Sequence, residues 1–78
     1  MIVLGSTGSI GVNTLAIAKQ FNLDIEVMVA GNNIKLLNSQ LQDFSPKLVI
    51  IASQNDVHKV NHSNVQVGQE AILNAIEN

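Results

Sequence analysis

The chain has 78 residues, of which 46% are hydrophobic and 13% are charged, with a formal net charge of −2. Cysteine is missing, which excludes disulfides and thiolate metal sites, and the weak negative charge, without tyrosine or tryptophan, argues against nucleic acid as a partner. No apolar run approaches the roughly 18 residues that span a bilayer, and no basic region precedes the first one, so we expect a cytoplasmic protein without membrane contact. The charged fraction lies well below the ~25% of typical domains, which indicates a piece of a larger protein.

Short β-branched runs alternate with longer helical patterns along the chain. A strand is expected at 2–4, a helix at 10–21, a strand at 25–29 and an amphipathic helix at 34–44 that Pro46 stops. The apolar run 48–51 is typical of a strand covered on both faces. Weaker patterns predict a short helix at 55–60, an edge strand at 65–67 and a last helix at 69–77. The alternation predicts one α/β domain, a Rossmann-like and mainly parallel sheet of about four strands flanked by helices.

The most informative segment is 5–11, which reads Gly-Ser-Thr-Gly-Ser-Ile-Gly between the first strand and the first helix. Gly5 permits the tight turn, Gly8 lets the backbone approach a pyrophosphate, and Gly11 lets the helix pack closely against the strand. The first helical amides, around Ser9 and Ile10, face outward at a helix end that carries roughly half a positive charge. The segment therefore predicts an anion site at the carboxyl end of a parallel strand.

Short hydroxyl side chains surround this turn. Ser6, Thr7 and Ser9 can donate hydrogen bonds to phosphate oxygens. A turn that merely needs glycine to bend is the alternative interpretation, but the strand before it and the helix after it match the dinucleotide fingerprint. The chain has no Gly-Lys-Ser/Thr ending here, which argues against a Walker-type phosphate loop.

The end of the second strand indicates which dinucleotide is bound. NAD-binding domains carry an acid there that holds the ribose hydroxyls, whereas this chain has Gly31, Asn32 and Asn33. No carboxylate is placed to repel a 2′-phosphate, which favours NADP over NAD. Asn33 is expected to cap the second helix, and Lys35 is near enough in sequence to lend a positive charge. An ordinary turn is the alternative, because glycine and asparagine are common in turns.

Four groups of residues together resemble one known family. They are the glycine heptad followed by Asn13-Thr14-Leu15, the Val-Ala-Gly-X-Asn run at 29–33, the set Leu36, Leu37, Gln40, Phe44, Pro46 and Lys47, and the late Gly68-Gln69-X-Ala71. With these residues, most of the chain resembles the opening of 1-deoxy-D-xylulose 5-phosphate reductoisomerase. The resemblance implies that residues 1–78 are the amino-terminal part of an NADPH-binding domain, an incomplete half of a dinucleotide-binding fold. Catalytic and carboxyl-terminal domains would lie outside this chain.

The resemblance also implies an activity and a set of cofactor contacts. The family rearranges and reduces 1-deoxy-D-xylulose 5-phosphate, a phosphorylated sugar, to 2-C-methyl-D-erythritol 4-phosphate in isoprenoid synthesis, as a homodimer using NADPH and Mg²⁺ or Mn²⁺. Many members carry a basic residue where this chain has Asn32. We expect no catalytic or metal-binding residue within 1–78, and no activity from these residues alone. Cofactor contacts are expected at Gly5, Ser6, Thr7, Gly8, Ser9, Ile10, Gly31, Asn32 and Asn33.

Two other functions remain open from the sequence. One is a different GxxGxxG dehydrogenase, such as an enzyme like aspartate-semialdehyde dehydrogenase, although the Ala-Gly-X-Asn match counts against it. The other is a nucleotide-sensing module without catalysis. The natural sequence after residue 78 discriminates between them. In the reductoisomerase family, a strand from that region would lie beside strand 2–4, so this chain alone is expected to be marginally stable or to self-associate through an exposed apolar edge.

His58 and His62 are four residues apart and could share one face of a helix. A zinc site needs at least a third protein ligand and usually an ordering second shell, and Asp56 is the only nearby acid. We therefore expect both histidines to face solvent rather than to bind a metal.

Overall fold

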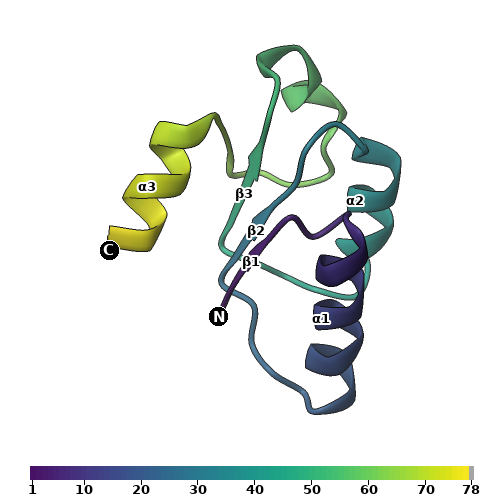
Figure 1. The fold of residues 1–78 in the computed structure, drawn as a ribbon. Helices are drawn as coiled ribbons and strands as arrows, with labels where there is room; N and C mark the ends of the chain where they lie inside the picture. The colour runs from purple at the N-terminus through teal and green to yellow at the C-terminus, as the bar shows by residue number, and fades with distance from the viewer. Residues whose placement is uncertain (78) are drawn as a thin grey trace.

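The computed structural model describes residues 1–77, which form a parallel sheet with helices on both of its faces (Figure 1). The helices are α1 (Ser9–Gln20), α2 (Ile34–Gln40), the 3₁₀ helix η1 (Gln54–Lys59) and α3 (Gln69–Glu77). The strands are β1 (Ile2–Leu4), β2 (Val27–Val29), β3 (Leu48–Ile51) and β4 (Val65–Val67).

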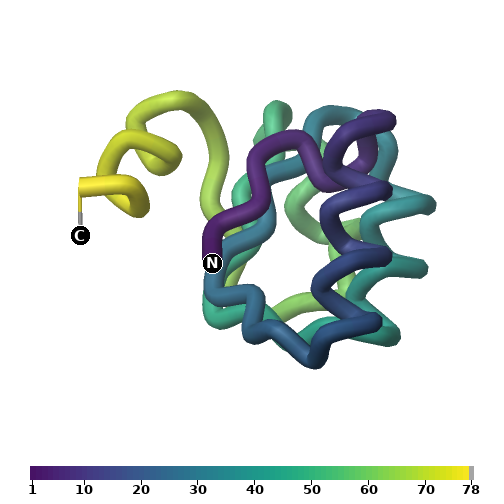
Figure 2. The backbone as a smooth tube through the Cα atoms, turned by 60° about the horizontal axis from the view of Figure 1, so that its bottom comes forward, coloured from purple at the N-terminus to yellow at the C-terminus, as the bar shows by residue number. Residues whose placement is uncertain are grey.

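The four strands are all parallel and lie in the order β1-β2-β3-β4. Ile2 is aligned with Val27, and Val27 with Leu48, so side chains at these positions share one face of the sheet. Helices α1 and α2 cover one face, whereas α3 lies on the other (Figure 2). Every strand ends at the same edge, where the loops leading to α1, α2, η1 and α3 are gathered. The expected α/β class with a mainly parallel sheet is confirmed.

Two apolar clusters hold these layers together. The larger lies beneath α1 and α2, and the smaller lies beneath α3. Strand β3 contributes to both, since Val49 and Ile51 belong to the larger cluster and Ile50 to the smaller, and none of the three is more than 1% exposed. The sequence-based expectation that this strand is covered on both faces is therefore confirmed.

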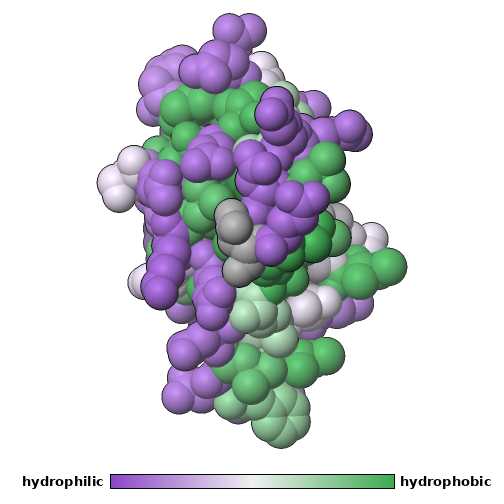
Figure 3. Space-filling view, turned by 90° about the vertical axis from the view of Figure 1, so that its left-hand side faces the viewer, coloured by the Kyte–Doolittle hydropathy of each residue, from purple (hydrophilic) through white to green (hydrophobic). Residues whose placement is uncertain are grey.

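Strand β1 lies at one edge of the sheet in the described part of the chain, and apolar surface collects around it. Its Val3 is buried toward α1, while Ile2 and Leu4 point to the α3 side and are 36% and 57% exposed. Further exposed hydrophobic residues lie on α3, where Leu73 and Ile76 face solvent. The molecule seen from the α3 side accordingly shows hydrophobic areas among the polar side chains (Figure 3).

Elements β2, α2 and η1 differ most from the sequence-based expectation, while α1 is displaced by one residue at each end. Strand β2 begins at Val27 rather than at residue 25, although the Glu26 amide still donates to the Met1 carbonyl at 2.8 Å. Helix α2 ends at Gln40, after which the Phe44 amide returns to the Gln40 carbonyl at 3.1 Å and closes one further turn. The weakly predicted helix at 55–60 is a 3₁₀ helix, which suits its short length.

Candidate functional site

The glycine-rich turn leaves β1 and enters α1 at the carboxyl edge of the sheet. Gly5 has φ +72°, a left-handed conformation that costs glycine little. The Gly8 amide donates to the Gly5 carbonyl at 3.0 Å and closes the turn, while the Ser6 amide donates to Val29 of β2 at 2.9 Å. The predicted role of Gly5 as the turning residue is thus confirmed.

Helix α1 begins at this turn with free backbone amides. Gly8 is the N-cap, and its carbonyl accepts the first helical bond, from Val12 at 2.9 Å. Within residues 1–77, the amides of Ser9 and Ile10 have no backbone acceptor, and no side chain caps the helix. These amides carry the partial positive charge of the helix end, so the turn presents donors for an anion.

Three glycines around this edge are constrained in different ways. A Cβ built on Gly11 would overlap the Gly5 carbonyl, so Gly11 allows α1 to pack on β1, as predicted. A Cβ on Gly8 would meet only the Gly5 oxygen, at 3.4 Å, and one on Gly31 would meet nothing within 4 Å. Gly8 has φ −83° and ψ 172°, a conformation open to any residue. Packing therefore requires glycine at position 11, whereas a Cβ at position 8 would meet one oxygen at ordinary contact distance and a Cβ at position 31 would meet nothing.

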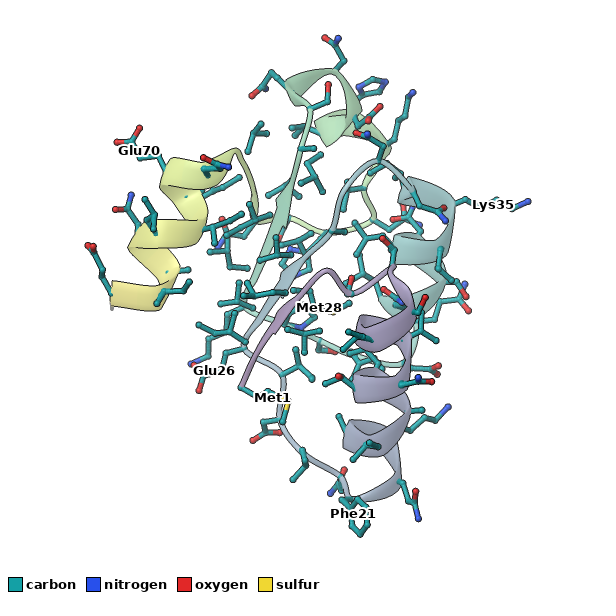
Figure 4. The ribbon with its side chains drawn as sticks, in the orientation of Figure 1. Met1, Phe21, Glu26, Met28, Lys35 and Glu70 are labelled. Carbon is teal, nitrogen blue, oxygen red and sulfur yellow. The ribbon has the colours of Figure 1, made fainter. Side chains whose placement is uncertain are left out.

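The loop between β2 and α2 lies next to the glycine turn. Its Ala30 amide donates to the Ile50 carbonyl at 2.8 Å, which fixes the loop against β3. The Asn33 side chain accepts from the Leu36 amide at 3.2 Å and caps α2, as predicted. Asn32 is exposed, and neither asparagine brings a negative charge. Lys35 points away from the sheet into solvent (Figure 4).

The three hydroxyl residues of the turn occupy unequal positions. Ser9 is exposed and Thr7 is half-buried, so both can meet a ligand. Ser6 is 0% exposed, and its hydroxyl has no hydrogen-bond partner in the described structure. The Ser6 hydroxyl is therefore not presented to a ligand here. Its carbonyl oxygen instead accepts a hydrogen bond from the Gln40 side chain at 2.7 Å, a contact that the sequence alone did not reveal.

The histidine expectation is wrong for His62. Its Nε2 lies 2.6 Å from the Pro46 carbonyl, and its Nδ1 lies 3.0 Å from the Asn64 amide. A neutral ring protonated on Nε2 satisfies both contacts, because Nδ1 then accepts and Nε2 donates. His62 thus ties the segment before β3 to the segment before β4. His58 is exposed, as expected.

Among residues 1–77, no three histidine, cysteine, aspartate or glutamate side chains are grouped as metal ligands would be. Within the same range, none of the helices combines the length and apolar character that crossing a membrane requires.

A family model for 1-deoxy-D-xylulose 5-phosphate reductoisomerase matches residues 1–78. The chain belongs to this family. Curated proteins with that name include one from Nautilia profundicola, which is 51% identical over 99% of this chain and 21% of its own length. The protein from Campylobacter lari is 54% identical over 97% of this chain and 21% of its own. The protein from Helicobacter pylori is 48% identical over 99% of this chain and 22% of its own length.

Membership in the reductoisomerase family confirms the resemblance drawn from the glycine heptad and the Ala-Gly-X-Asn run. The chain spans about a fifth of the length of these relatives. The residues matched are those that build the parallel sheet and its carboxyl edge, so the candidate site lies within the matched region. The shared name marks the relatives as reductoisomerases, enzymes that catalyse oxidoreduction.

Proposed function

We propose that residues 1–78 are the amino-terminal part of the NADPH-binding domain of a 1-deoxy-D-xylulose 5-phosphate reductoisomerase. The complete enzyme would rearrange and reduce its phosphorylated sugar to 2-C-methyl-D-erythritol 4-phosphate in isoprenoid synthesis. Bound NADPH would supply the hydride, while these residues would bind and orient the dinucleotide. This proposal rests on family membership together with the geometry of the carboxyl edge.

The observation that carries the proposal is the pair Gly8 and Gly31. Both lie at the carboxyl edge of the sheet, after β1 and β2, and the packing of the described chain gives little reason for a glycine at either. The free amides of Ser9 and Ile10 follow Gly8 at the start of α1. Glycines that leave backbone open beside a helix N-terminus let a pyrophosphate approach closely, as in dinucleotide-binding folds.

The cofactor contacts expected from the sequence divide into two groups within this proposal. Thr7, Gly8, Ser9 and Ile10 would hold the pyrophosphate, with Gly5 shaping the turn. Gly31, Asn32 and Asn33 would face the adenosine ribose, where the missing carboxylate permits a 2′-phosphate. Ser6 would act through its backbone, because its side chain is buried.

Several parts of the proposal concern the complete enzyme. The homodimer and the phosphorylated sugar substrate follow from the family resemblance, whereas the cytoplasmic location is proposed from the sequence pattern. The divalent metal, Mg²⁺ or Mn²⁺, also follows from the resemblance. The resemblance places its acidic ligands, like the catalytic residues, in later segments of the family's sequence.

Calorimetric titration with NADPH and with NADH tests the proposal, using the complete natural protein. We expect NADPH to bind more tightly, and Gly8→Val to weaken it by at least about tenfold because branched carbons would enter the space of the pyrophosphate. Ser63→Val is the matched control, since Ser63 is exposed before β4 at the opposite edge of the sheet. A folded Gly8→Val protein that binds NADPH as well as the wild type would contradict the proposed site.

A further inference from the structure

A hydrogen bond joins the glycine turn to the end of α2. The Gln40 side-chain amide donates to the Ser6 carbonyl at 2.7 Å, across 34 positions of sequence. The bond is partly buried, and Ser6 itself is fully buried. Gln40 is the last residue of α2, so this contact ties the second helix directly to the turn that follows the first strand.

The bond from Gln40 to the Ser6 carbonyl also sets the direction of the neighbouring Thr7 N–H. The Ser6 carbonyl and the Thr7 N–H belong to the same planar trans peptide, in which the two groups point in opposite directions. Because Gln40 holds the carbonyl toward α2, the Thr7 N–H is directed away from α2. Within residues 1–77, no backbone oxygen accepts from that N–H. The Thr7 amide is therefore available as a donor beside the amides of Ser9 and Ile10.

We propose that Gln40 is a positioning residue for the cofactor, setting the Ser6–Thr7 peptide so that the Thr7 amide donates to the pyrophosphate of the dinucleotide. This inference rests on the proposed function of the glycine turn. Gln40 does not touch the cofactor and acts only through Ser6.

The Gln40 amide makes one contribution beyond packing, the hydrogen bond that it donates to the Ser6 carbonyl. Its Oε1 atom is buried and has no hydrogen-bond partner in the described structure. An unpaired buried oxygen is costly, so an apolar side chain of similar size would satisfy packing at a lower cost. The contribution that an apolar side chain cannot make is the donor bond to Ser6.

The first experiment compares two ligands with the complete natural protein and its Gln40→Met variant. NADPH contains the pyrophosphate, whereas adenosine 2′-monophosphate carries only the adenosine and 2′-phosphate groups that would meet Gly31, Asn32 and Asn33. We expect Gln40→Met to weaken NADPH binding about tenfold, the size expected for one charge-assisted hydrogen bond. Binding of adenosine 2′-monophosphate should change by less than about twofold. Gln42→Met, at an exposed position two residues later, is the matched control.

The outcomes separate this inference from the proposed function. If the wild-type protein binds no dinucleotide, the proposed function fails and the inference fails with it. If the wild type binds NADPH and Gln40→Met binds it equally well, the inference alone is overturned. If Gln40→Met weakens the binding of both ligands equally, the substitution acts on the fold in general, and the inference is also overturned.

A second measurement needs no variant at position 40. Threonine occurs at 7 and 14 within residues 1–78. In the ¹⁵N-threonine-labelled complete protein, Thr7→Ser and Thr14→Ser identify these two amide resonances by their disappearance. We expect NADPH to move the Thr7 resonance of the wild-type protein and to leave Thr14, which lies inside α1, nearly in place. A Thr7 resonance that does not respond while NADPH is bound would overturn the inference, even if Gln40→Met does not fold.

Discussion

The α-carbon of Gly11 faces the carbonyl oxygen of Gly5, and a methyl group added to Gly11 would overlap that oxygen. Helix α1 can therefore sit against the end of β1 only while position 11 carries no side chain. A methyl group added to Gly8, three residues earlier, would lie 3.4 Å from the same oxygen and would not overlap it. Gly11 thus serves the packing of the fold, whereas Gly8, under the proposed function, leaves room for the pyrophosphate.

Gly11→Ala is expected to destabilise the protein by about 1–3 kcal/mol or more, since backbone rather than a flexible side chain must move. Gly31→Ala should leave the free energy of unfolding unchanged or raise it by up to about 1 kcal/mol, because alanine restricts the unfolded chain. Urea unfolding of both variants tests this contrast. Equal stability of the two would contradict the packing role of Gly11.

Asn32 offers a test of dinucleotide selectivity. Asn32→Asp should reduce the preference for NADPH over NADH, because the new carboxylate would repel the 2′-phosphate and accept from ribose hydroxyls. Asn32→Lys should strengthen NADPH binding and make it more sensitive to salt. Titrations with both dinucleotides at low and high ionic strength measure the ratio of the NADH and NADPH dissociation constants. If neither substitution alters it, the 2′-phosphate does not lie beside this loop.

Asn33→Ala is expected to cost about 1 kcal/mol of stability through loss of the α2 cap. The reason is the bond from the Leu36 amide to the Asn33 side chain. Asn33→Asp should retain that bond and most of the stability, which makes it the conservative control. Thermal unfolding followed by circular dichroism compares the three proteins.

His62→Phe is expected to destabilise the protein by about 1–3 kcal/mol, since the Pro46 carbonyl and the Asn64 amide would lose their partner. His58→Phe, at an exposed position, should change stability by less than about 0.5 kcal/mol. Chemical unfolding of the two variants distinguishes a structural histidine from a solvent-facing one. Similar losses in both would contradict the role given to His62.

The apolar edge formed by Ile2 and Leu4 should govern the behaviour of residues 1–78 produced alone. We expect that fragment to self-associate or to unfold at modest temperature, because β1 offers unpaired backbone groups beside exposed apolar side chains. Leu4→Lys should shift the fragment toward monomer in sedimentation velocity. Gln66→Lys adds the same charge on β4, at the other edge of the sheet, and should leave the association of the fragment unchanged. A wild-type fragment that is monomeric and melts at high temperature would contradict this expectation.

The local sequence pattern was sufficient to predict the order of strands and helices along the chain. β-branched runs and helical spacing predicted every strand and helix, because side-chain period is set by the backbone geometry of each element. The roles of Gly5, Gly11 and Asn33 were also predictable, since a turn, a close contact and a helix cap each depend on residues near in sequence. Element ends were less certain. The regular part of α2 stops at Gln40, although Leu41 and Phe44 still pack on the core as its apolar pattern predicted.

The sequence by itself therefore determined the α/β class, the family and the position of the glycine turn. The tertiary structure alone decided that Ser6 is buried, that Gln40 holds its carbonyl, that His62 joins two loops and that Lys35 points away from the sheet into solvent. Each of these depends on which segments the fold brings together, such as residues 34 positions apart. Hydrogen bonds over such separations leave no periodic trace in the sequence, because only the packing of helices against a common sheet sets the distance between their ends.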